Sequence, residues 1–439
     1  MRRMTTRPSL SNRLRLISLC AFILFLHGCA AIQSLQEQSW LAPQYPEQQI
    51  ERNRFAVPKG NDVIGQLAIL RLEKGDTLPD IARHFSLGIN AISAANPGVD
   101  LWVPRTGERI TLPLSFILPD APREGIVVNL ATMRLFQYQT DGGSMRVSTY
   151  PVGVGTRERP TPTGQMYVER KAIRPTWYVP ASIAEDHRKK GSPLPAKVPP
   201  GPDNPLGEYA LYLSKSSYLI HGTNKPASIG LNATNGCLRL YPENIKLLFD
   251  DTPVKTPVAI VNQPYLVGER EGVLYLEAHT PQTGMAAAEL ERIRSRLRGM
   301  EKQAARPFDW NRIQEVLAEA RGIPVPIFEM RPGSAQRMVN AIEIAHPGEL
   351  FGRPRIPELS LTGWYVLAAD LRDEIEARRM AAIINHQGPP IPARVLSESN
   401  RHRVIAGPFH DSSEAEVAAR RLKIDLGIDG IVIEPVSKS

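Results

Sequence analysis

The sequence predicts a protein of several domains, in which a mainly β domain at the centre is flanked by a small α/β unit and by a C-terminal α+β unit. With 439 residues, 42% of them hydrophobic, the chain can bury more than one core. Short apolar runs separated by Gly, Pro and Asn fill the centre, a pattern typical of antiparallel sheets. The flanking segments alternate between strand-like runs and helical apolar spacing.

The amino terminus has the features of an export signal. The first segment contains five arginines and no acid (Arg2, Arg3, Arg7, Arg13 and Arg15), and an apolar run extends over residues 14–26. A membrane-spanning helix needs ~20 apolar residues, so this run favours a secretory signal over residues 1–28. Leu26-His27-Gly28-Cys29 resembles a bacterial lipobox, which implies acylation of Cys29, and Ala30 then favours the outer membrane. An ordinary cleaved signal and an uncleaved anchor are the alternatives.

The charge of the chain is concentrated in that signal. The formal net charge is +8, and removal of the five arginines leaves 8 − 5 = +3. A nearly neutral mature chain gives no electrostatic case for a nucleic-acid partner. We therefore expect no nucleic acid among its ligands.

A tether and a compact unit follow the signal. Residues 29–65 are rich in Gln, Pro and charge without a clear period, as in a tether. Residues 66–113 predict a β-α-α-β unit. Its expected elements are a strand over 67–72, a helix that Thr77 caps with Asp80 and that buries Leu78, Ile81, Ala82 and Phe85, a helix over 89–95 and a strand over 109–112.

The central domain is expected over residues 124–262. Its clearest strand patterns lie at 126–130, 134–138 and 209–213, and a short helix is expected from Pro242 to Phe249. The segments 160–164 and 192–205 are too rich in proline for central strands or helices, so they are expected to be loops that frame a cleft.

The last two segments differ in the strength of their patterns. Residues 263–360 predict a helical connector, with amphipathic helices over 285–300 and 310–320. Residues 361–437 predict the order β-α-β-β-α-β, which is that of a split βαβ unit. Its elements are expected over 364–368, 371–385, 394–396, 401–406, 413–426 and 430–433.

The strongest chemical signal lies between Leu219 and Tyr241. His221 ends an apolar run, and Cys237 follows a loop that contains Asn235 and Gly236. If Cys20 leaves with the signal and Cys29 is lipidated, Cys237 is the only thiol left, with no partner for a disulfide. Such a cysteine is a candidate nucleophile, and His221 is a candidate base for it. The alternative is a buried small side chain beside a structural histidine.

The motifs around this pair resemble those of the L,D-transpeptidase catalytic domain of the YkuD type. The matching segments are His221-Gly222-Thr223, Ser228-Ile229-Gly230, 234–239 (TNGCLR), 125–138, 151–155, 161–164 and 204–207. The resemblance implies a mainly β, sandwich-like fold that acts on peptidoglycan stem peptides. Many members carry a second histidine where this chain has Asn235, which cannot exchange a proton near neutral pH.

The resemblance also implies roles for individual residues. The Cys237 thiolate forms a thioester with a tetrapeptide stem, and His221 exchanges protons with the leaving and incoming amines. A His221 imidazolium is expected to lower the pKa of the thiol below its usual ~8.5. The amides of Asn235, Gly236 and Cys237 can face the oxyanion. Gly222 and Thr234 belong to the motif, and Arg239 holds a stem carboxylate or braces the loop. No metal or other cofactor is expected.

The flanking units resemble two modules that bind cell walls. Gly75-Asp76-Thr77-Leu78, Ile81-Ala82 and Asn96-Pro97 are similar to a lysin motif (LysM), which implies binding to glycan strands. Residues 403–409 (RVIAGPF) before an Ala-rich helix are similar to the sporulation-related repeat (SPOR), which implies binding to glycan without stem peptides. A generic α/β cap and an unrelated ferredoxin-like unit are the respective alternatives.

Three functions remain open at this point. The enzyme transfers a stem to another stem or to an amine on an envelope protein, in the periplasm at a membrane to which the lipid on Cys29 attaches it. Alternatively, water resolves the thioester, which makes the protein a carboxypeptidase or a hydrolase. In the third, Asn235 marks a catalytically inactive centre and the chain is an anchor to the wall.

Overall fold

The computed structural model describes residues 50–435, except 190, 282–285, 305 and 329–340. The predicted signal, its lipobox and most of the predicted tether, with Cys20 and Cys29, lie outside the described residues. No helix within the described ranges is both long and apolar enough to cross a bilayer.

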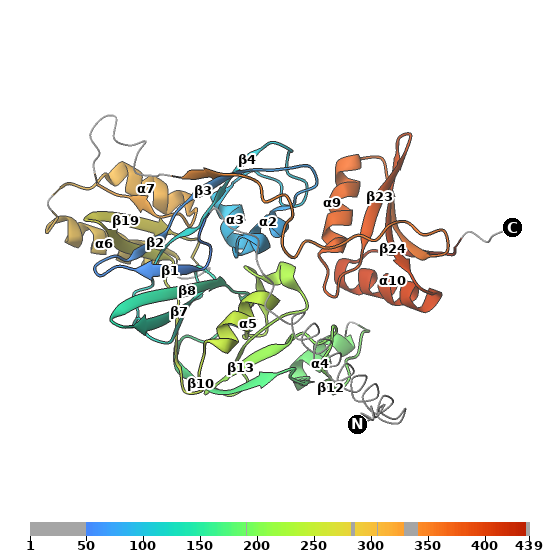
Figure 1. Cartoon of the computed structure of the whole chain (residues 1–439), viewed down its shortest axis with the longest axis horizontal. Helices are drawn as coiled ribbons and strands as arrows, with labels where there is room; N and C mark the ends of the chain where they lie inside the picture. Colours follow the sequence, from blue (N-terminus) through green and yellow to red (C-terminus); the bar gives the residue numbers. More distant parts are fainter. Residues whose placement is uncertain (1–49, 190, 282–285, 305, 329–340, 436–439) are drawn as a thin grey trace, which may run out of the picture. The chain divides into compact units, whose positions relative to one another are not determined.

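A nine-stranded sheet forms the centre of the chain and confirms the prediction of a mainly β domain (Figure 1). Only β6–β17 and β14–β16 pair in parallel within it, and the other neighbours are antiparallel. Its strands in spatial order are β1 (Arg54–Val57), β8 (Ser144–Pro151), β7 (Arg134–Asp141), β6 (Ile126–Asn129), β17 (Pro257–Val261), β10 (Gly164–Ile173), β13 (Tyr209–Leu213), β14 (Leu219–His221) and β16 (Leu238–Arg239).

The two faces of this sheet bury different cores. Leu135, Leu211 and Ile220 point into one core, which helix α5 (Pro242–Asp250) covers. Val127 and Phe136 point to the opposite face and share a second core with the amino-terminal unit. The sheet therefore stands between two apolar layers at the β1 to β17 end, whereas residues at the β10 to β16 end reach solvent on this opposite face.

The amino-terminal unit has the predicted order of elements. It consists of β3 (Ala68–Arg71), α2 (Leu78–His84), α3 (Ile89–Ala95) and β4 (Arg109–Leu112). Thr77 caps α2, because its hydroxyl accepts a hydrogen bond from the Asp80 amide at 3.2 Å. The four side chains predicted to form the apolar stripe of α2 are all buried: Leu78, Ile81, Ala82 and Phe85.

The predicted tether over 29–65 is wrong at its C-terminal end. Residues Arg54–Val57 form β1, which pairs with β8 at the edge of the central sheet, and Val63–Gly65 form β2, which pairs with β5 (Ser115–Ile117). Phe55 and Val57 alternate with exposed neighbours and are buried in the shared core. Four residues carry too short an alternation to indicate a strand by themselves.

The predicted helical connector is a mixed α/β unit. Helices α6 (Ala286–Glu301) and α7 (Trp310–Glu319) confirm the two predicted helices. They pack on a sheet of β18 (Tyr265–Arg270), β19 (Val273–Ala278) and β20 (Val325–Pro326). Glu271 and Gly272 both have positive φ, at 52° and 75°, which fits a tight hairpin turn between β18 and β19. This turn was not predicted from the sequence, because Glu is an uncommon residue in it.

Two further small pairings complete this part of the chain. Strand β21 (Ile342–Ile344) joins β3 in parallel and so belongs to the sheet of the amino-terminal unit. Strands β11 (Trp177–Tyr178) and β12 (Lys197–Val198) pair in an antiparallel manner. Helix α4 (Ala181–Lys189) lies between them in the sequence and has no buried residue. Of the proline-rich segment 192–205 that was predicted to be a loop, only Lys197–Val198 form a strand, and α4 precedes the segment.

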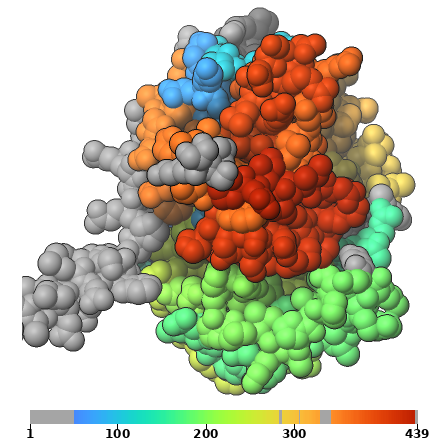
Figure 2. Space-filling view, turned by 90° about the vertical axis from the view of Figure 1, so that its right-hand side faces the viewer, coloured from blue at the N-terminus to red at the C-terminus, as the bar shows by residue number. Residues whose placement is uncertain are grey.

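The C-terminal unit confirms the predicted β-α-β-β-α-β order. Its elements are β22 (Trp364–Leu371), α9 (Glu374–Asn385), β23 (Ala393–Glu398), β24 (Arg401–Phe409), α10 (Ser412–Leu426) and β25 (Ile431–Ile433). The strands lie in the order β23-β24-β22-β25, and both helices pack into a core of their own with Val366, Ile384 and Leu422. Figure 2 shows the side chains of this unit in orange to red as one compact group.

Candidate active site

His221 and Cys237 lie on one face of two adjacent strands. In the parallel pair β14–β16, Ile220 is opposite Leu238 and His221 is opposite Arg239. Ile220 and Leu238 are buried in the core under the sheet, so the alternation of side chains places His221 and Arg239 on the opposite face. Cys237 immediately precedes β16 and lies on that same face by the same alternation. The structure thus brings the predicted base and nucleophile to one strand pair.

The imidazole of His221 is buried and neutral. Its Nδ1 lies 2.6 Å from the Gly222 carbonyl oxygen, which can only accept, so Nδ1 carries the hydrogen and Nε2 is the basic nitrogen. Burial and the positive charge of Arg239 lower the pKa of His221 to about 3. The expected imidazolium is therefore not the form present at neutral pH. Because desolvation disfavours the charged ring, His221 is suited to accept a proton only as the reaction proceeds.

Cys237 is a partly exposed free thiol. Its Sγ donates a hydrogen bond to the Ser217 carbonyl oxygen at 3.6 Å. Burial raises the pKa of Cys237, while the Leu219 amide and the Arg239 guanidinium act in the opposite direction. The sulfur is consequently protonated at neutral pH, so it can serve as a nucleophile only if a base removes its proton.

Thr234 builds the turn that presents the cysteine. Its Oγ1 donates to the Cys237 carbonyl oxygen at 2.7 Å and accepts from the Gly236 amide at 3.1 Å. Gly236 has a φ of 102°, and a Cβ there would lie 2.8 Å from the Tyr218 ring. Only glycine fits this conformation and this approach. In the structure the Gly236 amide thus bonds to Thr234, which differs from its expected role as an oxyanion donor.

Arg239 is a cation whose charge acts on both His221 and Cys237. Its Nη1 donates to Ser228 Oγ at 3.5 Å, and its Nε is buried without a hydrogen-bond partner among the residues that the structure describes. Burial lowers the pKa of Arg239, and the nearby Cys237 opposes this shift. A buried donor with no partner is costly unless a ligand satisfies it, so Arg239 is suited to hold an anionic group.

A second arginine, Arg159, contacts the cysteine loop and was not among the residues predicted from the sequence. Its Nη1 donates to Asn235 Oδ1 at 2.6 Å, and its Nη2 lies 2.7 Å from Asp186 Oδ2 on α4. Arg159 precedes the Pro160 to Gly164 segment that carries part of the family resemblance. That position was the only signal available, because both of its partners are distant in the sequence.

Gly222 connects the histidine strand to its surroundings. A Cβ at this position would lie 3.2 Å from the Ile245 side chain and 3.3 Å from the Leu206 carbonyl oxygen. The neighbouring backbone at Leu206 also approaches the imidazole of His221. A glycine after His221 therefore allows α5 and the Leu206 segment to pack closely against the end of the histidine strand.

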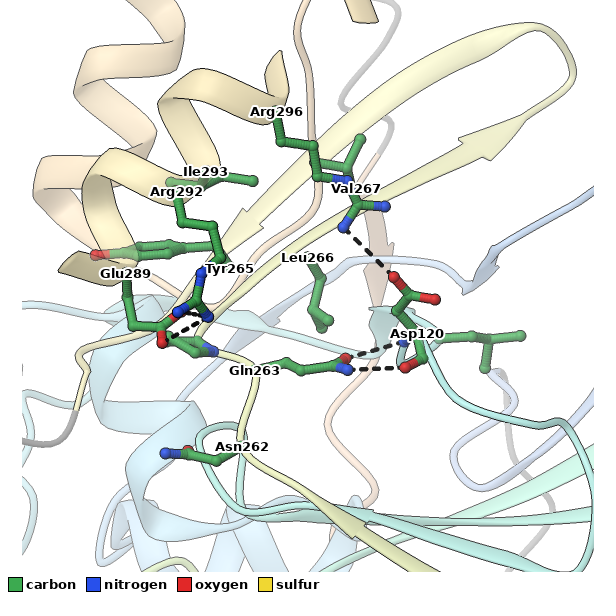
Figure 3. Close-up of a pocket in the computed structure, with 12 residues that line it drawn as sticks. Asp120, Asn262, Gln263, Tyr265, Leu266, Val267, Glu289, Arg292, Ile293 and Arg296 are labelled. Carbon is green, nitrogen blue, oxygen red and sulfur yellow. Dashed lines mark hydrogen bonds and ion pairs between the residues drawn. The ribbon is translucent and has the colours of Figure 1, made fainter. Parts of the chain in front are cut away.

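A pocket of about 250 Å³ lies at a different place, between α6, β18 and the segment 262–264 (Figure 3). Its charges are already paired, since Arg292 contacts Glu289 at 2.9 Å and Arg296 contacts Asp120 at 3.6 Å. Gln263 also exchanges hydrogen bonds with the backbone of Asp120. The pocket shares no residue with the strand pair of His221 and Cys237. Within the described ranges, no group of three or more His, Cys, Asp and Glu side chains is arranged to hold a metal ion.

Comparisons with known proteins agree with the fold. Residues 123–260 match the L,D-transpeptidase catalytic domain family YkuD, and residues 360–434 match the SPOR domain family. The probable L,D-transpeptidase ErfK/SrfK of Salmonella typhimurium is 38% identical over 292 residues, which cover 63% of this chain and 91% of that protein.

Two relatives from Escherichia coli (strain K12) give the same result. The probable L,D-transpeptidase YbiS is 41% identical over 226 residues, or 51% of this chain and 73% of YbiS. The probable L,D-transpeptidase YcfS is 41% identical over 230 residues, or 51% of this chain and 71% of YcfS. With a central domain of the YkuD type and a C-terminal SPOR domain, the chain belongs to the L,D-transpeptidase family.

Proposed function

We propose that this chain is a cysteine-dependent peptidoglycan L,D-transpeptidase. It forms a thioester between Cys237 and a tetrapeptide stem and transfers the stem to an amine. The observation that carries this proposal is the placement of His221, Cys237 and Arg239 on one face of the β14–β16 pair. A neutral base on the same face of the strand pair as a protonated, partly exposed thiol supports a mechanism in which proton transfer and attack are coupled.

The reaction proceeds in two halves. As Sγ of Cys237 attacks the carbonyl between the diamino acid and the terminal D-Ala, Nε2 of His221 takes the thiol proton. The C–N bond then breaks, and His221 returns that proton to the departing D-Ala amine. An incoming amine next attacks the thioester and gives its proton to His221, and the sulfur leaves and recovers a proton from the imidazolium.

The surrounding donors stabilise the charge that develops. With the Gly236 amide bonded to Thr234, the amides of Asn235 and Cys237 remain as oxyanion donors. Of the two roles expected for Arg239, the buried Nε without a partner among the described residues favours binding of a stem carboxylate. Asn235 takes part through its amide and through the bond to Arg159, and needs no proton exchange of its own.

The flanking units fit an enzyme that works on a cell wall. We assign residues 66–113 to a LysM module, supported by the β-α-α-β order of β3, α2, α3 and β4. The SPOR domain, expected over 361–437 and matched over residues 360–434, is assigned as the second unit that binds glycan strands. The catalytic domain spans 124–262, and the α/β unit that follows extends through the segment 263–360.

The location follows from the amino-terminal segment. Residues 1–28 act as a lipoprotein signal, Cys29 carries the lipid, and a tether that ends before β1 connects the lipid to the folded chain. The protein then works in the periplasm, attached to the outer membrane. An amine on another stem or on an envelope protein is the acceptor.

Mass analysis of the products tests the function. Purified protein is incubated with a muropeptide that bears a tetrapeptide, with Cys237→Ala as the matched control. The wild type is expected to form a crosslinked dimer and to release D-Ala. The variant is expected to form neither product. A tripeptide alone would instead indicate a carboxypeptidase, and no change would indicate a wall anchor. Normal turnover by Cys237→Ala would refute the mechanism.

A further inference from the structure

A row of four residues runs across the sheet from Cys237 on the solvent side of the site. Arg170 on β10 is opposite Tyr212 on β13, and Tyr212 is opposite Leu219 on β14. In the parallel pair β14–β16, Ile220 is opposite Leu238. The residues that precede them, Leu219 and Cys237, are therefore also adjacent across the two strands. Tyr212 and Leu219 point away from the core, because Leu211, Leu213 and Ile220 beside them are buried in it and Tyr218 packs against it. Arg170 and Cys237 share that face as their cross-strand partners.

The guanidinium of Arg170 is stacked on the ring of Tyr212. Its Cζ lies 3.3 Å from the ring centroid, and the Arg170 side chain is exposed while Tyr212 is half-buried. Among the residues that the structure describes, no carboxylate forms an ion pair with Arg170. Stacking fixes the plane of a guanidinium and leaves the N–H groups at its edge free to bind a carboxylate with two hydrogen bonds. The pair is thus a preorganised anion-binding group.

The distance of this group from the sulfur corresponds to a short peptide. Adjacent strands are ~4.8 Å apart, so a cation above the β13 ring stands ~10 Å from the β16 position, two strand spacings away. An extended chain spans ~3.3–3.6 Å per residue, so ~10 Å is about three residues. A stem whose scissile carbonyl lies at Cys237 can therefore place an upstream residue over Tyr212.

We propose that Arg170 and Tyr212 form the subsite for a free carboxylate of the donor stem, on the glycan side of the scissile bond. This inference rests on the proposed function and specifies which part of the donor the site selects. The carboxylate binds the exposed edge of the Arg170 guanidinium, and the Tyr212 ring holds that guanidinium in place. A donor whose carboxylate is converted to a carboxamide loses this interaction.

Paired donors test the subsite in the full-length protein. Initial rates are measured for a stem with the free carboxylate and for its carboxamide, with wild type, Arg170→Gln and Arg170→Lys. For the carboxylate donor, Arg170→Gln should lower kcat/KM about tenfold through KM, the size expected for one exposed charge-assisted contact. For the carboxamide donor the change should be below about twofold. Arg170→Lys should recover part of the loss, because it keeps the charge but not the planar fork.

A matched control comes from the same face of β10. Lys255 lies over the Tyr167 ring at 4.3 Å, a cation on an exposed aromatic ring outside the row of Cys237. Lys255→Gln should leave the preference for the carboxylate donor unchanged. Equal losses with both donors, no loss with either, or an effect on the acceptor KM alone would overturn the subsite.

A binding measurement separates this inference from the transfer reaction. In the Cys237→Ala background, the carboxylate donor should bind about tenfold more tightly with Arg170 present than with Arg170→Gln, and the carboxamide donor should not distinguish them. That result would support the subsite even if the wild type transferred no stem, an outcome that would refute only the proposed function. Equal affinities would refute the subsite whether or not transfer occurs.

Discussion

Arg159 holds the side chain of Asn235, with 2.6 Å between Nη1 and Oδ1, two residues before Cys237. The same guanidinium contacts Asp186 Oδ2 at 2.7 Å, so one cation connects the cysteine loop with α4. A carboxamide oxygen accepts this bond, whereas a protonated imidazole at position 235 would meet a like charge. Asn235 is therefore compatible with an ordered loop, and its presence does not by itself indicate an inactive centre.

Arg159→Gln should lower kcat about tenfold with little change in the donor KM. The variant loses a charge-assisted hydrogen bond that positions the loop, and such bonds contribute about 1.5–3 kcal/mol. Asp186→Asn is the control, because it leaves the Arg159–Asn235 bond in place and should cost less. Steady-state transfer rates check this, and a rise in KM with kcat unchanged would argue that Arg159 binds substrate instead.

His221→Gln should slow formation of the thioester by at least about 100-fold at neutral pH, since general bases contribute 10²–10⁴-fold. The rate of the variant should rise with pH more steeply than that of the wild type, because hydroxide must then remove the thiol proton. Intact-protein mass spectrometry after rapid quenching follows the acyl-enzyme. An acylation rate equal to that of the wild type would remove His221 from the mechanism.

Arg239→Gln should move the titration of Cys237 to higher pH. Burial already raises the pKa of this thiol, and the Arg239 cation opposes the shift by favouring the thiolate. Removal of the cation therefore lowers the thiolate fraction at every pH below the pKa. Rates of alkylation by iodoacetamide across the alkaline range report this fraction, with Arg239→Lys as the charge-retaining control. A shift to lower pH would contradict the assigned electrostatics.

Gly236→Ala should destabilise the fold by about 1–3 kcal/mol, through both a left-handed backbone and a clash. A Cβ would lie 2.8 Å from the Tyr218 ring at a φ of 102°. Gly98→Ala provides the comparison, since Gly98 has a φ of 85° with nothing within 4 Å of the added Cβ. The Gly98→Ala change should lower the free energy of unfolding by only about 1 kcal/mol. Urea unfolding of both variants measures the difference. Equal losses in the free energy of unfolding would show that the Tyr218 ring moves aside for the added methyl group.

Deletion of residues 360–439 should leave the rest of the chain folded, whereas deletion of residues 1–118 should not. The C-terminal unit has its own core around Val366 and Leu422. The amino-terminal unit instead shares a core with Val127 and Phe136 of the central sheet, which its removal would expose. Thermal unfolding and size-exclusion chromatography compare the two shortened chains. A cooperative, monomeric chain without residues 1–118 would contradict the shared core.

Much of the fold could be predicted from local patterns. The helix over Ile89–Ala95 and the strand over Arg109–Leu112 agree with the structure residue by residue, because capping residues and apolar spacing act within a few positions. The prediction was wrong at β1 and at the β18–β19 hairpin. Strand β1 is stabilised by its pairing with β8, more than eighty residues away, which no local pattern reports.

By itself, the sequence determined the order of the units, the candidate pair His221 and Cys237, and the glycine that the cysteine loop requires. Those features follow from residue type and short-range spacing. Only the tertiary structure decided that the imidazole is buried and neutral, that Arg159 holds Asn235, and that Arg170 shares a cross-strand row with Cys237. Burial and pairing between strands depend on contacts between distant segments, and these contacts set the charges and distances on which the chemistry depends.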